Sequence, residues 1–441
     1  MGKRFVLFLI TCGMVLSSCT GCKHSELKKS EPVTLTMWHV YGEQAYSPMD
    51  KLVEEFNETV GYEKGIIIDV TALSNANEIG DKLLAAQEGK PGALPMPDLF
   101  FAHASNARAI GAENLVDWRE VFSEKQLSEY VPDFLEDGVI NERLCVFPTS
   151  KSTYMLYIAG EQFDRFSQAT GVTYESLADW DGFFDAAEKY YEWSGGKPFC
   201  CFDYLLRNIE LYAQANGAED LFLENGQYDY SNPVFRSAFD RFANAVAMGY
   251  IKVSDLYANT QIMTGEIMCG VESSAAILYF NDHVTYADGT SEPTNLKVLP
   301  MPQVKNQKGY MPISGVGLCA YKTTSQKAEA AAVFAQWFTE PERNLEFVCE
   351  TGYMPVANGA FEKIDGYSFS SPAYESLYAA MKQMKESTTA VSSYATSEYY
   401  KTLNAFYDYL RQNQDYLHQR QKSGESTESL SEELWTQLQS E

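Results

Sequence analysis

Along residues 33–110, short apolar runs alternate with stretches in which apolar residues recur about every 3.6 positions. Three runs, VTLTMWHV, GIIIDVTA and MPDLFFAH, are short, apolar and rich in β-branched or aromatic residues, which is typical of strands. A stretch with helical spacing follows each run. The first of these, SPMDKLVEEFNE, has Ser47 in the N-cap position and Pro48 in the first helical position. Strand and helix therefore alternate three times, which predicts an α/β protein with parallel βαβ units.

The ends of these predicted strands carry candidate ligand contacts. In open parallel sheets, ligands bind beyond the carboxyl ends of the strands. This rule indicates Trp38, His39 and Tyr41 after the first strand, and His103 after the third. A packing or strand-capping role is the alternative for each of these side chains.

The segment RLCVFPTSKSTYMLYI has a polar run between two apolar flanks. This pattern predicts an extended connection between two lobes, and its polar middle would face the space between them. Ser150, Lys151, Ser152 and Tyr154 are therefore candidate contacts. The chain from there to about residue 268 reads as mostly helical and rich in aromatic residues, and LKVLPMPQ and YMPISGVGLCAYK read as further strands.

The C-terminal third reads as helical. SQKAEAAAVFAQWF predicts one helix, and EPERNLEFVCETG predicts a second that stops at Gly352. A further amphipathic stripe consists of Tyr399, Tyr400, Leu403, Phe406, Tyr407 and Leu410. The acidic, serine-rich tail from about Gln421 is predicted to be frayed, apart from the segment LWTQL.

The N-terminus reads as an export signal. Lys3 and Arg4 precede an apolar run that ends at Leu16, and small residues follow it. This run is shorter than the ~20 residues that a membrane-spanning helix needs. The segment LSSC resembles the bacterial lipoprotein box, which implies a signal peptide over 1–18 and a lipidated Cys19 as the first mature residue. An ordinary signal peptide with a chance cysteine is the alternative, and Cys22 is a weaker candidate for lipidation.

Size and charge restrict the possible partners. A chain of 441 residues exceeds the size at which one hydrophobic core stops growing, so two lobes are expected. The net charge is −26 at pH 7, and the predicted signal would remove two further basic residues. This charge argues against binding to nucleic acid or to anionic lipid, so a lipid anchor would have to supply membrane attachment. Residues 19–31 are polar and read as a tether.

The nine cysteines do not form a metal-binding pattern. Cys200 and Cys201 are adjacent, and the five histidines lie far apart along the chain. Most of the other cysteines have apolar neighbours, which favours buried free thiols over disulfides. We expect neither a metal nor a cofactor.

Several segments, taken in order, resemble the extracellular solute-binding proteins of ABC importers, the group that includes sugar-binding proteins. They are LTMWHVYG, PDLFF, NLVD, FPTSKSTYMLYI, GEIMCG, VLPMP, SGVGLCAYKTTSQKAEAAAVFAQWF and TGYMPV. The resemblance covers nearly the whole mature chain. It departs from the family pattern after the first strand, where the chain has His39, Tyr41 and Glu43, and again at LADWDGF.

The resemblance implies a fold of two α/β lobes with a hinge and a ligand cleft between them. One lobe would contain residues 32–149 and 322–368, and the other residues 150–321 and 369–441. The family pattern adds candidate contacts to those inferred from the strand ends: Asp203, Tyr204, Glu272, Ser273, Ser274, Ser314, Gly315 and Tyr353.

The implied function is capture of a mono- or oligosaccharide by lobe closure, and delivery to the permease subunits of an ABC transporter. Such a protein would be a monomer anchored outside the cell membrane, and it would perform no chemistry on its ligand. Aromatic rings and short polar groups, in which this chain is rich, suit sugar faces and hydroxyls. A binder of a phosphorylated polyol, a sensor subunit and an exported glycoside hydrolase remain as alternatives.

Overall fold

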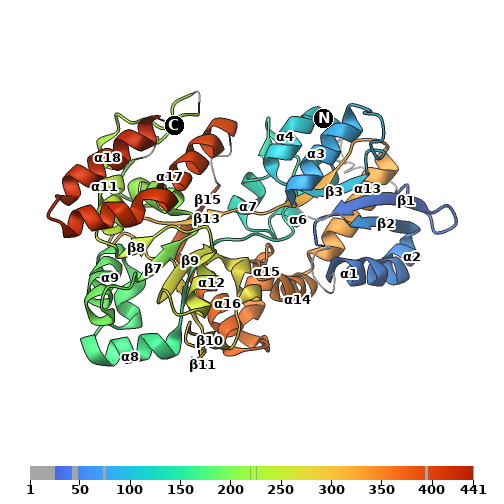
Figure 1. Cartoon of the computed structure of the whole chain (residues 1–441). Coiled ribbons are helices and arrows are strands. Elements are labelled where there is room, and N and C mark those ends of the chain that lie inside the picture. Colours follow the sequence, from blue (N-terminus) through green and yellow to red (C-terminus); the bar gives the residue numbers. More distant parts are fainter. Residues whose placement is uncertain are drawn as a thin grey trace, which may run out of the picture.

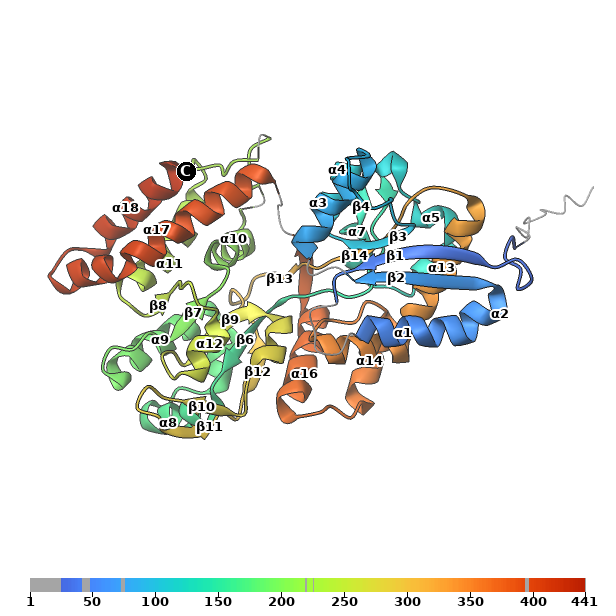
Figure 2. The same ribbon diagram turned by 45° about the vertical axis from the view of Figure 1, so that its right-hand side comes forward.

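The computed structural model describes residues 25–41, 48–72, 76–218, 220–224, 226–392 and 396–440. The predicted signal segment 1–18, Cys19, Cys22 and the predicted cap Ser47 lie outside these residues. Two α/β bodies stand side by side and are joined by extended strands (Figure 1). A view turned by 45° shows the same division, with β13 and β15 between the two bodies (Figure 2). The two-lobed α/β architecture predicted from the sequence is confirmed.

The first lobe is built on a four-stranded sheet with the order β14-β3-β1-β2. Strands β1, β2 and β3 are parallel, and β14 is antiparallel to β3. The strands of this lobe are β1 (Val33–His39), β2 (Ile66–Ala72), β3 (Leu99–Ala102), β14 (Gly317–Ala320) and the hairpin β4 (Val139–Ile140) with β5 (Arg143–Leu144). Its helices are α1 (Pro48–Phe56), α2 (Tyr62–Lys64), α3 (Ala76–Gln87), α4 (Ala104–Ile110), α5 (Trp118–Val121), α6 (Glu124–Leu127), α7 (Pro132–Glu136), α13 (Ser325–Phe338), α14 (Pro341–Thr351) and α15 (Asn358–Lys363).

Local sequence explains how the first βαβ unit turns. Gly65 adopts a left-handed conformation with φ +72°, which ends α2 and turns the chain into β2. Asn57 donates from Nδ2 to the Ile68 carbonyl and accepts from the Ile68 amide, so one side chain fixes the end of the helical segment on the neighbouring strand. The central strand β1 is paired on both edges, and its carboxyl end is buried on both faces.

The second lobe is built on a five-stranded sheet with the order β12-β6-β9-β7-β8. Strands β9, β7 and β8 are parallel, whereas β6 is antiparallel to both of its neighbours. These strands are β6 (Tyr154–Ile158), β7 (Cys200–Phe202), β8 (Ile251–Lys252), β9 (Cys269–Ser273) and β12 (Lys297–Pro300), beside a hairpin of β10 (His283–Thr285) and β11 (Ser291–Pro293). The helices are α8 (Gly160–Thr170), α9 (Trp180–Ser194), α10 (Leu205–Ala215), α11 (Pro233–Ala247), α12 (Ala258–Met263), α16 (Pro372–Ser387), α17 (Ser397–Lys422) and α18 (Thr427–Ser440).

The acidic tail forms the helix α18, so the prediction that it frays outside LWTQL is wrong, whereas the order expected of LWTQL (434–438) is confirmed. Leu430, Leu434, Trp435 and Leu438 of α18 are buried. The Trp435 ring lies 5.0 Å from the Phe239 ring and 5.4 Å from the Phe235 ring, both on α11. Figure 1 shows α18 beside α11 and α17. Four apolar residues at helical spacing are enough to dock a helix whose other positions are acidic or polar.

The chain passes between the two lobes in three places. Residues 149–153 and 313–316 are two of them and run beside each other, and the third lies between α15 and α16. Strand β15 (Thr388–Ser392) connects α16 to α17 within the second lobe and runs parallel to β13 (Gly309–Ile313). The predicted lobe limits at 149/150, 321/322 and 368/369 lie at or near these passages, whereas β15 is not predicted. Because β14 belongs to the first sheet, the second passage ends before Gly317, whereas the predicted lobe limit at 321/322 assigns this strand to the second lobe.

The cysteines of the described part are free thiols, as the sequence predicts. Five are buried, namely Cys145, Cys200, Cys201, Cys269 and Cys319, and Cys349 is half-buried. None of the helices in the described ranges is both long and apolar enough to cross a membrane.

Gly352 joins the two lobes closely, and we expect its replacement to be costly. It has φ +71°, and a Cβ there would lie 2.7 Å from Ile277 Cγ2 and 2.9 Å from Ala275 Cα of the second lobe. Gly171 has a similar φ of +77° but open space around it. Gly171→Ala should cost about 1 kcal/mol of unfolding free energy from backbone strain, and Gly352→Ala about 1–3 kcal/mol more from overpacking. Urea denaturation of both variants measures the difference, and equal losses would contradict the close contact.

Candidate functional site

The predicted contact residues gather where the lobes are joined. The Lys151 amide donates to the Met354 carbonyl at 3.2 Å, and the Ser152 amide donates to the Ser314 carbonyl at 2.9 Å. These backbone bonds place the polar run of the first passage against the second passage and against the turn after α14. These bonds hold the polar residues 149–153 where the two lobes meet, a region that we call the lobe junction.

Two of the residues predicted to follow the first strand lie within β1 itself and are interior side chains. Trp38 is buried in a core cluster with Ile79 and Leu83 of α3. His39 is fully buried, with Nε2 3.1 Å from Asp50 Oδ1, while its Nδ1 accepts from the Tyr41 amide at 3.2 Å. Burial lowers the pKa of His39. The structure therefore gives both side chains packing partners, and ligand contact by them stays a prediction.

Tyr41 is a predicted contact residue that is buried, and its hydroxyl lies near residues of the lobe junction. Its ring packs edge-on against Phe101 and Phe347, and burial raises the pKa of its hydroxyl. Thr149, Ser150 and Tyr353 are the polar side chains around that hydroxyl. The chain after β1, the first passage and the turn after α14 thus meet at Tyr41, Ser150 and Tyr353.

His103 and Lys151 are neighbours across the junction. His103 occupies the N-cap position of α4, and burial is the main cause that lowers its pKa, with the Lys151 charge lowering it further. Lys151 is almost fully buried and donates from Nζ to Asp137, a carboxylate that also accepts from the Ser392 hydroxyl of β15. The Lys151 charge is therefore matched inside the protein.

The second lobe presents aromatic rings at the carboxyl end of its sheet. The ring of Tyr154, at the start of β6, stacks on that of Tyr204 at 4.7 Å with an interplanar angle of 5°. Burial raises the pKa of Tyr204 to about 12, and the hydroxyls of Tyr257 and Tyr400 act on it electrostatically. We call Tyr154, Tyr204, Tyr257 and Tyr400 the tyrosine face.

Two members of the tyrosine face were missed by the sequence reasoning. Tyr257 precedes α12 and is 68% exposed, and Tyr400, on α17, is 47% exposed although the pattern places it in an apolar stripe. No local signal distinguishes these tyrosines from the buried majority. Their exposure is the sign that they have a surface role, since large exposed rings near one another mark interaction sites.

Two carboxyls adjoin the tyrosine face. Asp203 Oδ1 accepts from the Ala258 amide at 3.1 Å, and burial raises the pKa of Asp203 to about 7. Glu272, on the neighbouring strand β9, is buried, and burial raises its pKa well above the usual range, with Asp203 adding to the effect.

The remaining predicted residues border this region. The Ser273 hydroxyl accepts from the Ala275 amide at 3.3 Å and caps the short 3-10 helix Ser274–Tyr279. The Ser274 amide donates to the Thr153 carbonyl, and its hydroxyl is buried with no protein partner. Ser314 is exposed, and Gly315 has φ +125°, where a Cβ would lie 3.5 Å from the Ser150 carbonyl oxygen. These residues line the junction, and their contact with ligand stays a prediction.

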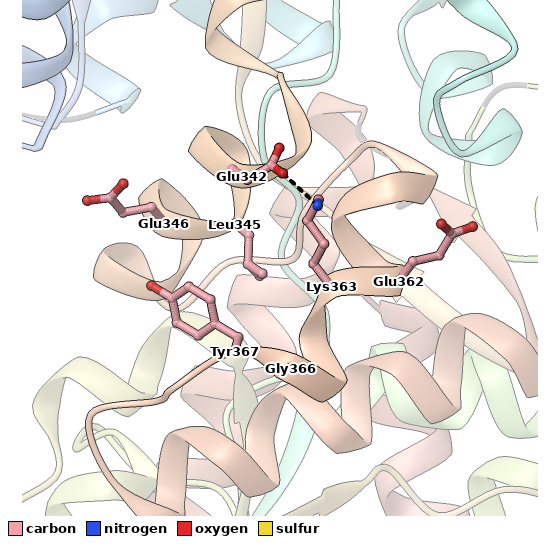
Figure 3. A pocket seen from close by; sticks show the side chains of 7 residues that line it. All are labelled: Glu342, Leu345, Glu346, Glu362, Lys363, Gly366 and Tyr367. Atoms are coloured by element: carbon pink, nitrogen blue, oxygen red, sulfur yellow. Dashed lines mark ion pairs between the residues drawn. The ribbon is translucent and has the colours of Figure 1, made fainter.

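The surface hollows lie elsewhere. One of about 460 Å³ between α14 and α15 is lined by Glu342, Leu345, Glu346, Glu362, Lys363, Gly366 and Tyr367. Figure 3 shows its charged side chains, with Lys363 bonded to Glu342 at 2.6 Å. A groove of about 640 Å³ runs beside α13. Neither contains a predicted contact residue. We place the candidate site at the lobe junction because the passages between the lobes, the rings of the tyrosine face and the carboxyls of Asp203 and Glu272 come together there.

Comparison with known proteins identifies the family of the chain. Residues 51–375 match the model of a family described as bacterial extracellular solute-binding proteins. The chain belongs to this family. No curated protein sequence matches this solute-binding protein significantly.

Solved structures share its fold over 92% of the chain. They include the cyclic α-maltosyl-1,6-maltose binding protein of Arthrobacter globiformis, with 15% identity, a TM-score of 0.68 and 98% of that chain covered. The sugar-binding protein MalE of Xanthomonas citri has 15% identity, a TM-score of 0.69 and 96% covered. UgpB of Mycobacterium tuberculosis, solved with glycerophosphocholine, has 17% identity, a TM-score of 0.65 and 98% covered. At these identities the likeness shows the fold of this solute-binding protein, not its ligand.

Proposed function

We propose that this solute-binding protein captures a mono- or oligosaccharide between its lobes and delivers it to the permease subunits of an ABC transporter. The tyrosine face is the observation that carries the proposal. Sugar rings present C–H faces that pack on aromatic rings, and their hydroxyls bond to short polar groups. Tyr257 and Tyr400 supply the ring faces, and Asp203 and the serines of the passages supply polar partners. Two of the similar folds belong to proteins described as maltose-type or sugar binders.

Lobe closure is the proposed mechanism. A ligand that touches both lobes binds the closed form better, so its binding raises the population of that form. A preference of about 5.5 kcal/mol would move the equilibrium from 1:99 to 99:1. A permease would then recognise the closed form. We propose that the protein acts as a monomer and performs no reaction on the ligand.

An anionic ligand such as a phosphorylated polyol has less support. UgpB, which shares the fold, was solved with glycerophosphocholine. Anion binding calls for unmatched cations or helix N-termini. The one lysine among the predicted contacts, Lys151, is already bonded to Asp137.

We also propose that the protein is exported and held at the outer face of the cell membrane by lipid on Cys19. The LSSC segment and the polar stretch after it support this, and a family of extracellular proteins fits it. One acyl chain binds a membrane only reversibly, so durable attachment needs more than one chain. Cys19→Ser should move the protein from the membrane fraction to the soluble fraction, with Cys22→Ser as the matched control. Membrane retention of Cys19→Ser would contradict the proposal.

A thermal-shift screen against mono- and oligosaccharides tests the ligand class. A sugar that binds only the folded protein at 100 times its Kd adds about 2.7 kcal/mol of stability and raises the Tm. Small-angle scattering with that sugar should show a smaller radius of gyration. Product analysis of the same mixtures would reveal hydrolysis, which would favour a glycoside hydrolase instead. A Tm raised only by phosphorylated solutes would overturn the carbohydrate assignment.

A further inference from the structure

Asp203 and Glu272 occupy adjacent positions on neighbouring parallel strands. Phe202 of β7 pairs with Val271 of β9, so the next residue on each strand is one of these two acids. Neighbouring strands lie about 4.8 Å apart, and residues in register point to the same face. That face is covered by α12, whose first amide donates to Asp203 and whose Asn259 amide interacts with Glu272. Two carboxyls therefore share one small space.

This pair has no compensating cation among the described residues. Glu272 is 1% exposed, and its Oε1 has no hydrogen-bond partner in the protein. Burial raises the pKa of both acids, and no lysine, arginine or histidine acts on either one. At neutral pH, Asp203 is therefore only partly ionised, and burial beside Asp203 favours the protonated form of Glu272. Two carboxyls this close cannot both ionise without a positive partner.

The titratable and charged groups around the pair come from every element packed against it. They are Cys200 and Cys201 on β7, Tyr154 and Tyr157 on β6, Lys252 on β8, Tyr204 and Arg207 at α10, Tyr257 before α12, and Tyr400 on α17. Both cations in this set are engaged with other acids. Lys252 lies 3.6 Å from Glu266, and Arg207 lies 2.7 Å from Glu210.

The tyrosine face adjoins the acid pair. Asp203 directly precedes Tyr204, and the charge of Asp203 acts on the pKa of the Tyr204 hydroxyl. The faces of tyrosine rings are electronegative and attract ammonium groups within about 6 Å. Exposed rings on one side and uncompensated carboxyls beneath them together make a surface that favours positive charge.

We propose that Asp203, Glu272 and the tyrosine face form a subsite for a cationic nitrogen, so that the preferred ligand is a carbohydrate bearing a protonated amine. The inference rests on the proposed function, which places a carbohydrate at this junction. A ligand cation supplies the missing partner, and the acid pair can then ionise. The strongly negative protein also raises the local concentration of cationic solutes.

The protons that the acid pair releases on binding determine how the affinity depends on pH. A bound cation stabilises the carboxylates and lowers their pKa, so binding releases protons from the pair. Affinity for a ligand whose positive charge does not titrate, such as choline, therefore rises with pH through about 7, where free Asp203 becomes half ionised. From pH 7 to pH 5.5 it should fall about tenfold. Affinity for a neutral ligand should not fall in this way.

Calorimetric titration with matched trisaccharides tests the proposal. The glucosamine trisaccharide carries amines, and its N-acetylated form is the neutral match. At pH 7 we expect the amine form to bind at least tenfold more tightly, with proton release that shows in buffers of different ionisation enthalpy. Glu272→Gln and Asp203→Asn should each reduce this preference to less than threefold. Glu266→Gln, which alters a surface carboxylate beside Lys252, should leave it unchanged.

The outcomes separate this inference from the proposed function. Equal binding of the two trisaccharides at pH 7, or a preference unchanged in Glu272→Gln, overturns the cation subsite and leaves carbohydrate capture standing. Choline, a quaternary ammonium that does not titrate, is the third probe. If choline binds in a Glu272-dependent way and neither trisaccharide binds, the carbohydrate assignment fails and the cation subsite stands. Failure of all three probes to bind overturns the subsite. Melting curves confirm that each variant is folded.

Discussion

Arg207→Met should lower the free energy of unfolding by about 3–5 kcal/mol, because it leaves a buried carboxylate without its positive partner. Arg207 Nη1 lies 2.7 Å from Glu210 Oε2 within α10, and the two side chains are 4% and 0% exposed. Tyr228 donates to the same carboxylate at 2.6 Å. Arg207 Nη2 also donates to the Ser392 carbonyl of β15 at 2.8 Å, so the same substitution removes a bond to the strand that pairs with β13. Urea denaturation measures the loss.

Two further variants test whether burial of the Arg207–Glu210 ion pair causes this loss of stability. Arg165→Met removes a bidentate pair with Glu292 at 2.8 Å, but its side chains are 46% and 26% exposed, so we expect a loss of about 1 kcal/mol or less. The double variant Arg207→Met with Glu210→Gln removes both buried charges and should regain most of the stability. Equal losses for Arg207→Met and Arg165→Met would show that burial of the pair is unimportant.

Tyr257→Ala should weaken binding of the preferred sugar by about 30-fold, which corresponds to about 2 kcal/mol for a ring at the centre of a binding surface. Tyr257 is 68% exposed, so its removal should change the unfolding free energy by less than about 0.5 kcal/mol. Tyr400→Ala should act in the same direction. Calorimetric titration gives the Kd, and scattering reports whether the lobes still close.

Tyr416 is the matched control for this prediction. It lies on the same helix as Tyr400, is 59% exposed, and has the Arg420 guanidinium 5.5 Å from its ring centroid. Tyr416→Ala removes a ring of the same kind outside the tyrosine face, so the Kd should stay within a factor of two. If Tyr257→Ala and Tyr416→Ala bind the sugar equally well, the tyrosine face is not the ligand surface.

The first βαβ units could be predicted closely from the sequence alone. The predicted segments around β1, β2 and β3 match the observed strands, because each short apolar run is bounded by turn residues and followed by a helical period. The predicted stop at Gly352 follows from a left-handed cap that favours glycine. Such features depend on neighbouring residues only, and a sequence shows them directly.

The details of the site depended on contacts between distant residues. His39 is buried because β1 is a central strand, and its carboxyl end is covered by Asp50 and the helix that carries it. Strand β15 forms only against β13, almost 80 positions earlier in the chain, and its own residues have a weak strand pattern. In α18 the buried apolar residues recur at helical spacing, but the acidic and polar residues between them make this segment look unstructured in the sequence.

The sequence alone determined the α/β class, the order of the elements in the first lobe and the existence of two lobes, because periodicity, caps and chain length are local or bulk properties. Only the tertiary structure decided which tyrosines are exposed and which acids lie together. Tyr257 and Tyr400 are far apart in the chain, and Asp203 and Glu272 become neighbours only through the pairing of β7 with β9. Exposure and electrostatic coupling are properties of the packed chain, so the chemistry of the site appears only after folding.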